Sequence, residues 1–128
     1  MIFSILPSVR FFVVTNQSGQ ILTVRRGMYT GLPGGIAREN ETADMCGLRI
    51  IRNIGLPTRI GHQCVHLEQF EDNWDDVRST IVIYGFLKVY IMCIRDALWT
   101  CLNDTNVRFD ITVEAYRRFL VSSPAMVA

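Results

Sequence analysis

The sequence predicts an α+β domain in which a mixed β-sheet is held between two helices. Stretches rich in β-branched and aromatic residues recur along the chain and are separated by turn residues. Two other segments have apolar residues at helical spacing, one in the middle of the chain and one near its end. The chain has 128 residues, which suits a single domain spanning residues 1–128 and leaves no room for a second.

The first part of the chain is predicted to form a β-hairpin followed by a glycine-rich loop. Residues 9–15 (VRFFVVT) and 20–25 (QILTVR) have the composition of strands. Residues 16–19 (NQSG) between them are typical of a turn, so the two strands are expected to pair. Residues 27–35 contain four glycines and a proline, which predicts a loop around a short strand.

A helix is predicted over residues 42–54. Glu41 or Thr42 is expected to begin it, and Gly55 is expected to end it. Gly47 predicts a close contact between helix and sheet, because a glycine inside a helix is unfavourable by about 1 kcal/mol relative to alanine. The residues expected on the apolar stripe of this helix are Met45, Leu48 and Ile51.

The second half of the chain is predicted to add three strands and a closing helix. Residues 71–76 (EDNWDD) are expected to form an acidic loop, in which Trp74 either stacks on a ligand or covers the loop. The strand that follows is apolar on both faces, so it is expected to be buried on both. Asp110 is expected to cap the last helix. The strands are predicted at residues 59–70, 79–89 and 97–102, and the helix at residues 110–121.

The composition argues against several classes of protein. The 13 Lys and Arg residues are balanced by 12 Asp and Glu, which predicts no bulk-charge attraction to nucleic acid. Residues 81–102 are nearly long enough to span a membrane, but Lys88, Arg95 and Asp96 interrupt them, so buried strands are expected instead. Residues 1–6 are too short for a secretory signal. The four cysteines form no C-x-x-C pair, which predicts reduced thiols and a cytoplasmic protein.

One stretch of the sequence carries a family signature. Residues 32–35 (LPGG) are followed after five residues by Glu41, after seven more by Arg49, and the segment closes on residues 54–56 (IGL). This pattern resembles the box of the Nudix hydrolases, G-x5-E-x7-R-E-U-x-E-E-x-G-U, in which U is aliphatic. The order of the predicted elements also resembles that family, so the likeness covers nearly the whole chain. It implies a Nudix-like α/β/α sandwich.

Between Arg49 and Gly55 the sequence departs from the box. The family has E-U-x-E-E after the arginine, whereas this chain has IIRN and is one residue short. Ile50 stands in place of the first glutamate and Asn53 in place of one of the next pair. In the family these glutamates hold Mg²⁺ or Mn²⁺ and help to activate water. The resemblance therefore implies a degenerate box that binds a nucleoside diphosphate-linked or other phosphorylated ligand with weak or no hydrolysis.

Four residues are candidates for binding the phosphates of such a ligand. Gly34 and Gly35 let the backbone approach a phosphate and adopt dihedrals closed to other residues. Arg38 and Arg52 supply guanidinium groups, and Arg52 is positioned to replace the missing metal by bidentate contact with a phosphate. The alternative for the arginines is a solvated helix face.

The box remnants Glu41 and Arg49 are expected to pair across the loop and the helix. An active, divergent hydrolase is the alternative function, and it would hold Mg²⁺ or Mn²⁺ with Glu39, Glu41 and Asp44 or with the acidic loop. The simpler interpretation of Glu39 and Asp44 is that of acids stabilised at the start of a helix. Asn40 stands where the family often has glycine, so a positive φ is expected there.

A further group of possible metal ligands is His62, Cys64 and His66, which share one face of a strand. The outer two lie about 13 Å apart at a rise of about 3.3 Å per residue, so packed histidines are preferred to a metal site. The expected partner is a nucleotide-like phosphorylated ligand, with nucleic acid only as a capped or phosphorylated end and with no membrane. A non-catalytic interaction domain, and a homodimer, remain open because the apolar content is 49%.

Overall fold

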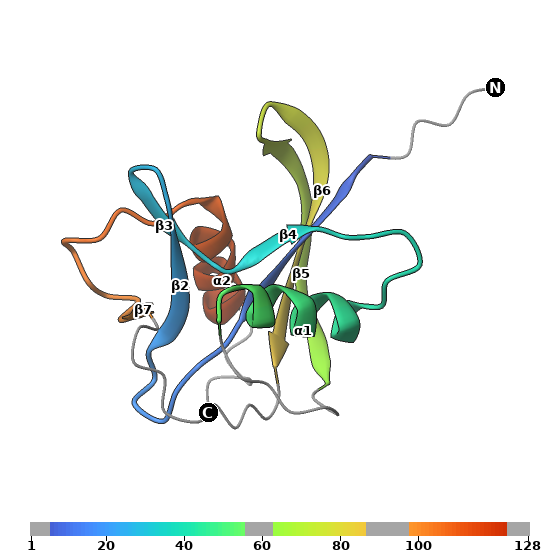
Figure 1. Ribbon diagram of the computed structural model, residues 1–128. Helices are drawn as coiled ribbons and strands as arrows, with labels where there is room; N and C mark the ends of the chain where they lie inside the picture. Colours follow the sequence, from blue (N-terminus) through green and yellow to red (C-terminus); the bar gives the residue numbers. More distant parts are fainter. Residues whose placement is uncertain (1–5, 56–62, 87–97, 123–128) are drawn as a thin grey trace.

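Two β-sheets and two helices make up the part of the chain that the computed structural model describes, residues 6–55, 63–86 and 98–122 (Figure 1). One sheet has four strands in the order β4-β1-β6-β5, and the other has three in the order β3-β2-β7. The elements are β1 (Ser8–Val13), β2 (Ile21–Arg26), β3 (Tyr29–Gly31), β4 (Gly34–Ile36), α1 (Ala43–Asn53), β5 (Cys64–Trp74), β6 (Val77–Phe86), β7 (Leu98–Thr100) and α2 (Ile111–Ser122).

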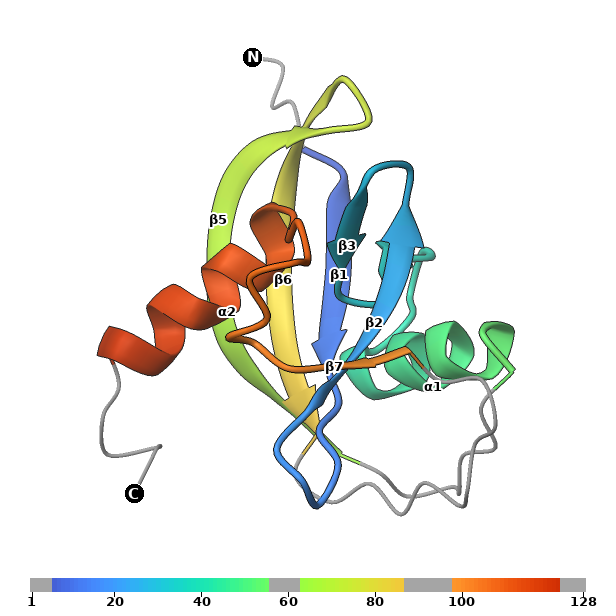
Figure 2. The same ribbon diagram turned by 90° about the vertical axis from the view of Figure 1, so that its left-hand side faces the viewer.

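The larger sheet is mixed, as the sequence predicts, and it lies between the two helices (Figure 2). Its strand β1 pairs in parallel with β6 and antiparallel with β4. Phe11 and Phe12 are both fully buried and point to opposite faces of β1. Phe11 belongs to the apolar cluster that includes Val113 of α2, and Phe12 to the cluster that includes Cys46 of α1. The prediction of an α/β/α arrangement is therefore confirmed.

The predicted hairpin between residues 9–15 and 20–25 is wrong over most of its length. β1 and β2 belong to different sheets, and only the base of the turn is paired, by the bridge between Thr15 and Ile21. The physical reason is burial, because a strand that is apolar on both faces gains more from a central position than from an edge. The expectation of one sheet is corrected in the same way, since β2 and β3 pair with β7 to form the second sheet.

α1 begins and ends where the sequence predicts. The side chain of Thr42 accepts a hydrogen bond from the backbone N–H of Met45, and Gly55 follows the helix with a φ of +84°. The predicted apolar stripe is wrong at Met45, which is 58% exposed, and right at Leu48 and Ile51. The buried side chains of the helix are those of Cys46, Leu48, Ile50 and Ile51.

Gly47 makes the close contact that the sequence predicts. A Cβ at this position would lie 2.5 Å from Cζ of Phe86 and 2.9 Å from Cε1 of Phe12. Such distances are shorter than real side-chain contacts, so glycine is required for α1 to approach the sheet this closely.

The predicted acidic loop at residues 71–76 is also corrected. β5 continues to Trp74, and only Asp75 and Asp76 form the turn, with φ values of +52° and +63°. Two consecutive positive φ angles are typical of the tight turn that joins twisted antiparallel strands. At the end of the strand, Glu71 and Asn73 are exposed while Asp72 and Trp74 are half-buried, and all four residues pair with β6.

α2 closes the structure against the other face of the larger sheet. The carboxylate of Asp110 accepts a hydrogen bond of 2.9 Å from the backbone N–H of Thr112, so Asp110 caps the helix as predicted. No helix within the described ranges is long and apolar enough to cross a membrane. Three parts of the predicted strands, at 59–63, 87–89 and residue 97, lie outside the described residues, except for residue 63. His62 also lies outside them.

Candidate ligand-binding site

The LPGG segment becomes the edge strand β4 beside β1. A Cβ on Gly34 would overlap Cδ1 of Phe11 and the carbonyl oxygen of Arg10. A Cβ on Gly35 would lie 3.1 Å from Cδ1 of Ile50. The expected unusual dihedrals are wrong, because neither Gly34 nor Gly35 has a positive φ. Gly34 is needed for close packing on β1, which brings the backbone of this strand to the surface of the pocket described below.

Glu41 and Arg49 form the pair that the sequence predicts. Nε of Arg49 lies 2.7 Å from Oε2 of Glu41, and Nη2 lies 2.9 Å from Oε1. Nη2 also donates to the carbonyl of Ile36, while Oε1 accepts the backbone N–H of Arg38. The side chains of Arg49 and Glu41 are only 19% and 11% exposed. This clamp ties β4, the loop and α1 together.

The clamp shifts the ionisation of both members. The hydrogen bonds from Arg49 lower the pKa of Glu41 to about 2, and those same bonds raise the pKa of Arg49. Asn40, next to the glutamate, has a φ of +61°, as expected. Both groups therefore stay charged across the physiological range, and their charges are directed at each other.

Arg10 is a member of this region that sequence reasoning missed. Its Nη1 donates a hydrogen bond of 2.9 Å to the backbone carbonyl of Glu41, which joins β1 to the loop. Its buried Nε has no hydrogen-bond partner among the described residues. A charged residue inside the apolar run VRFFVV was the available signal, since a buried charge needs a partner.

Ile50 lies on α1, at the position that the sequence resemblance aligns with the first glutamate of the box. It is 8% exposed, packs in a cluster with Phe12 and Cys46, and touches Gly35. A hydrocarbon side chain therefore fills the space between the helix and the glycine strand. Mg²⁺ and Mn²⁺ take oxygen ligands, usually carboxylates and water, so the residues of this box do not fit the metal that the fold implies.

The other metal candidates are separately engaged or exposed. Oδ1 of Asp44 accepts a hydrogen bond of 2.8 Å from the backbone N–H of Cys64, which ties α1 to β5. The hydrogen bond from the Cys64 thiol, followed by this backbone bond, lowers the pKa of Asp44. Glu39 is exposed on the loop. Over residues 6–55, 63–86 and 98–122, no group of three or more His, Cys, Asp and Glu side chains is placed to hold an ion.

Cys64 is half-buried on this strand, whereas His66 is exposed, so the expectation of packed histidines is not met at His66. Burial, followed by the effect of Asp44, raises the pKa of the Cys64 thiol to about 12. The ring of His66 meets that of Tyr84 edge-on, with centroids 5.8 Å apart. Neither side chain therefore has the environment of an activated nucleophile or ligand.

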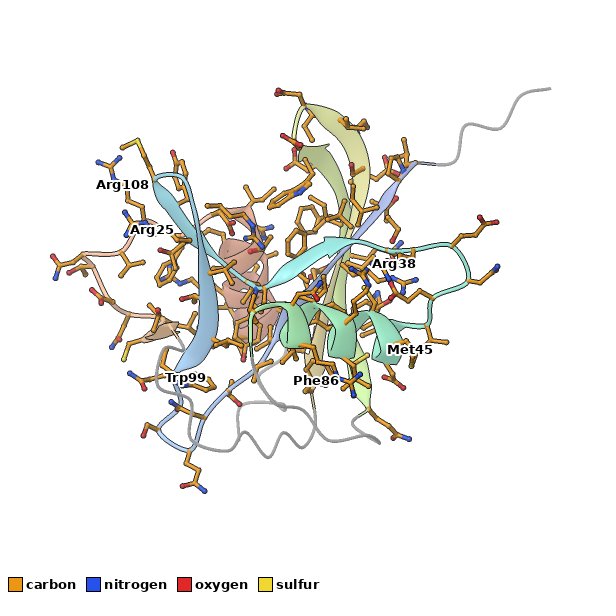
Figure 3. The ribbon with its side chains drawn as sticks, in the orientation of Figure 1. Arg25, Arg38, Met45, Phe86, Trp99 and Arg108 are labelled. Atoms are coloured by element: carbon orange, nitrogen blue, oxygen red, sulfur yellow. The ribbon has the colours of Figure 1, made fainter. Side chains whose placement is uncertain are left out.

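The candidate arginines Arg38 and Arg52 are both exposed. Arg38 lies on the loop that precedes α1, on the same side of the molecule as Met45 (Figure 3). Arg52 lies in the last turn of α1. Their roles in binding phosphate stay predictions.

A pocket of about 360 Å³ lies beside β4, between the tip of the β5–β6 hairpin and β2, and is lined by Arg26, Gly34, Trp74 and Asp75. The guanidinium of Arg26 lies 5.1 Å from the ring centroids of both Phe11 and Trp74. The rings of Phe11 and Trp74 meet edge-on at 4.7 Å. Trp74 therefore packs on the core and lines the pocket at the same time.

Two hydrogen bonds fix the guanidinium of Arg26. Nη1 donates to Oδ2 of Asp110 at 2.9 Å, and Nη2 donates to the carbonyl of Leu32. Burial lowers the pKa of Arg26, while Asp110 opposes that shift, and an arginine stays protonated in either case. A Cβ on Gly31 would overlap both Arg26 and Asp110, which explains the glycine there. The pocket thus combines a held cation with an aromatic wall.

No protein-family model and no curated protein matches the chain. Several solved structures resemble it in fold, at low sequence identity. The MutT Nudix hydrolase from Burkholderia pseudomallei superposes with a TM-score of 0.64 at 16% identity, over 85% of this chain and 96% of that one.

Two further solved structures support the same conclusion. The Nudix domain of Shewanella oneidensis NrtR, solved with ADP ribose, has a TM-score of 0.61 at 19% identity and covers 97% of this chain and 90% of that one. A UDP-X diphosphatase has a TM-score of 0.68 at 16% identity, over 98% of this chain and 66% of that one. The chain has the Nudix fold.

Proposed function

We propose that this protein binds a nucleoside diphosphate-linked or similar phosphorylated ligand and hydrolyses it weakly or not at all. The observation that carries the proposal is the place of Ile50, which is buried against Gly35 where the family has a glutamate. Hydrolysis of a pyrophosphate by this family depends on carboxylates at that position, and an isoleucine can neither hold a metal nor accept a proton.

The pocket beside β4 supports ligand binding. A guanidinium can contact a phosphate by charge and hydrogen bonds, and the Arg26 guanidinium is already held in one orientation. Trp74 offers an aromatic surface to a nucleobase. Structures with this fold include one bound to ADP ribose and one described as a UDP-X diphosphatase, which favours the same class of ligand here.

The proposal is tested by calorimetric titration of ADP ribose and of a UDP-sugar in the presence of EDTA. Asp75→Asn should strengthen binding about two- to fivefold, since it removes a carboxylate that repels the phosphates, and asparagine tolerates the positive φ at this turn. Arg26→Gln should weaken binding at least about tenfold. Arg78→Gln, on the same hairpin but outside the pocket lining, is the matched control and should bind as the unchanged protein does.

Two other outcomes of these experiments would favour the two alternative functions, a divergent hydrolase and an interaction domain. Conversion of ligand that depends on Mg²⁺ or Mn²⁺ would favour the divergent hydrolase and direct mutagenesis to Glu39, Glu41 and Asp44. If neither ligand binds and none is converted, the interaction domain becomes the better account of the chain.

A further inference from the structure

We propose that the outer edge of β5, together with the C-terminal end of α2, binds an extended segment of another protein that carries both basic and apolar residues. The segment adds to the larger sheet as a further strand beside β5. This surface, called the β5 edge, consists of residues 68–73 together with Phe119 and Leu120. The inference does not depend on the proposed function.

β5 is the last strand of the larger sheet, and part of its backbone is directed outward. Among the described residues, β5 pairs with β6 alone. The two-residue turn at Asp75 and Asp76 makes the residues that flank it a hydrogen-bonded pair, and every second pair from there is bonded in the same way. The residues whose N–H and C=O groups point away from β6 are therefore Gln69, Glu71 and Asn73.

Two hydrogen bonds confirm this direction. The backbone N–H of Gln69 donates to Oε1 of Glu68 at 3.0 Å, and the backbone N–H of Asn73 donates to Oδ1 of Asp72 at 2.7 Å. Each carboxylate thus covers a donor of the edge next to it in the sequence. Such exposed local bonds contribute little, so an added strand can replace them with its own carbonyl groups. The carboxylates are then available to cations of that strand.

α2 extends further than the sheet that it covers. Figure 2 shows its C-terminal end projecting past β5. Val113 and Ala115, in the first half of the helix, are fully buried. Phe119 and Leu120 lie on the same face of the helix, four and seven residues further on, and are only half-buried. A strand added about 4.8 Å beyond β5 would lie beneath this end of α2 and cover both side chains.

Carboxylates outnumber cations along the β5 edge. Glu68 and Asp72 lie on the face of β5 that is directed at α2, together with Phe70. Arg118 of α2 lies over the ring of Phe70, 5.9 Å from its centroid, and offsets one of these charges. The turn beyond β5 adds the carboxylates of two further aspartates. The edge therefore attracts a segment of positive charge.

These charges also distinguish between possible occupants. A second copy of β5, paired antiparallel about its centre, would set Glu68 opposite Asp72, and like charges in that position are unfavourable. A segment with two Lys or Arg residues four positions apart would instead meet both acids. An apolar residue midway between them would be on the side of α2. On the other face, Glu71 is already paired with Arg78 at 3.6 Å.

The test is an NMR titration of the full chain with the heptapeptide TRTITRT, acetylated and amidated at its ends. The sequence of this peptide reads the same in both directions, so it samples parallel and antiparallel addition alike. Amide shifts should be confined to residues 67–74 and 116–122, and the N–H of Glu71 should become protected from exchange. Affinity should fall at least about threefold between about 50 and 300 mM salt.

Variants separate the contributions of charge and apolar cover. The double change Glu68→Gln and Asp72→Asn should weaken binding about three- to tenfold and remove most of the salt dependence. Leu120→Ala should weaken binding about three- to tenfold and leave the salt dependence unchanged. Val121→Ala is the matched control, since Val121 is 83% exposed on the same helix, and it should bind as the unchanged protein does. The same spectra report that each variant is folded.

Four results would overturn the proposal. One is a titration without shifts at about millimolar protein and a tenfold excess of peptide. Another is a set of shifts located only around the Arg26–Trp74 pocket. The third is equal binding of the acidic peptide TETITET, which would mean that charge does not select the occupant. The fourth is a shift of the same amides on dilution without peptide, which would assign the edge to a second copy. Failure of ADP ribose to bind would refute the proposed function and would leave these outcomes unaffected.

Discussion

The Glu41–Arg49 clamp is the residue-scale feature on which the rest of the site depends. It could be predicted from the sequence because the spacing of the two residues matches the family box and both partners lie within nine residues of chain. The structure adds two hydrogen bonds to backbone carbonyls, from Arg49 to Ile36 and from Arg10 to Glu41. The spacing of residues in the sequence does not predict either bond. These extra bonds come from segments whose position is set by the sheet.

Glu41→Gln should destabilise the protein by about 1–3 kcal/mol at neutral pH, because it breaks a hydrogen-bonded charge pair. The folded-state pKa of about 2 lies below the ordinary value of 4.5. The stabilisation is therefore complete above pH 4.5 and is lost as the pH falls toward 2. Urea unfolding at several pH values measures this loss.

The matched control for the clamp is Glu39→Gln, which removes an exposed carboxylate two residues away. Its acid dependence should equal that of the unchanged protein. If Glu41→Gln and the unchanged protein lost stability in parallel between pH 4.5 and 2, the clamp would not have the role given to it here.

Ile50→Glu should not recreate a metal site. The new carboxylate would be buried among Phe12, Cys46 and the Gly35 strand, so stability should fall by roughly 2–4 kcal/mol. Thermal unfolding with and without Mg²⁺ checks this, and Ile50→Leu is the control that keeps the packing. A full recovery of stability on adding Mg²⁺ would show that the position still belongs to a functional metal site.

Among the helices and strands, the sequence predicted the ends of α1 correctly but not which strands pair with each other. The ends of α1 followed from Thr42 and Gly55, because caps act within one turn of the helix. The partner of β1 did not follow from its neighbour β2, since sheet pairing is decided by burial of both faces. The strands β5 and β6 are longer than predicted, because Asp75 and Asp76 alone form the turn that joins them and the predicted loop of residues 71–76 is not needed.

Gly47→Ala tests the packing of α1 on the larger sheet. The added methyl group would lie 2.5 Å from Cζ of Phe86, and such overpacking destabilises by about 1–3 kcal/mol. The gain in helix propensity is at most about 1 kcal/mol, so the net change should be a loss of stability. Denaturant unfolding should show it, whereas Asn53→Ala, on the exposed end of the same helix, should be neutral or slightly stabilising. An equally stable Gly47→Ala variant would mean that α1 does not approach the sheet this closely.

At the scale of the whole molecule, the pocket could not be predicted from the sequence. Its cation comes from β2, its aromatic wall from the end of β5, and the acid that holds the cation from the start of α2. No periodicity or spacing connects Arg26, Trp74 and Asp110. Only the sheet order and the close packing at Gly31 and Gly34 bring them together.

We proposed that this protein, which has the Nudix fold, hydrolyses its ligand weakly or not at all. The decisive measurement is mass spectrometry of a panel of nucleoside triphosphates, dinucleotides and sugar nucleotides, incubated at high protein concentration with Mg²⁺ or Mn²⁺ and with an EDTA control. We expect the panel to be recovered essentially unchanged and ligand binding to persist in EDTA. Metal-dependent conversion of any panel member at the rate of an ordinary enzyme would refute the proposal.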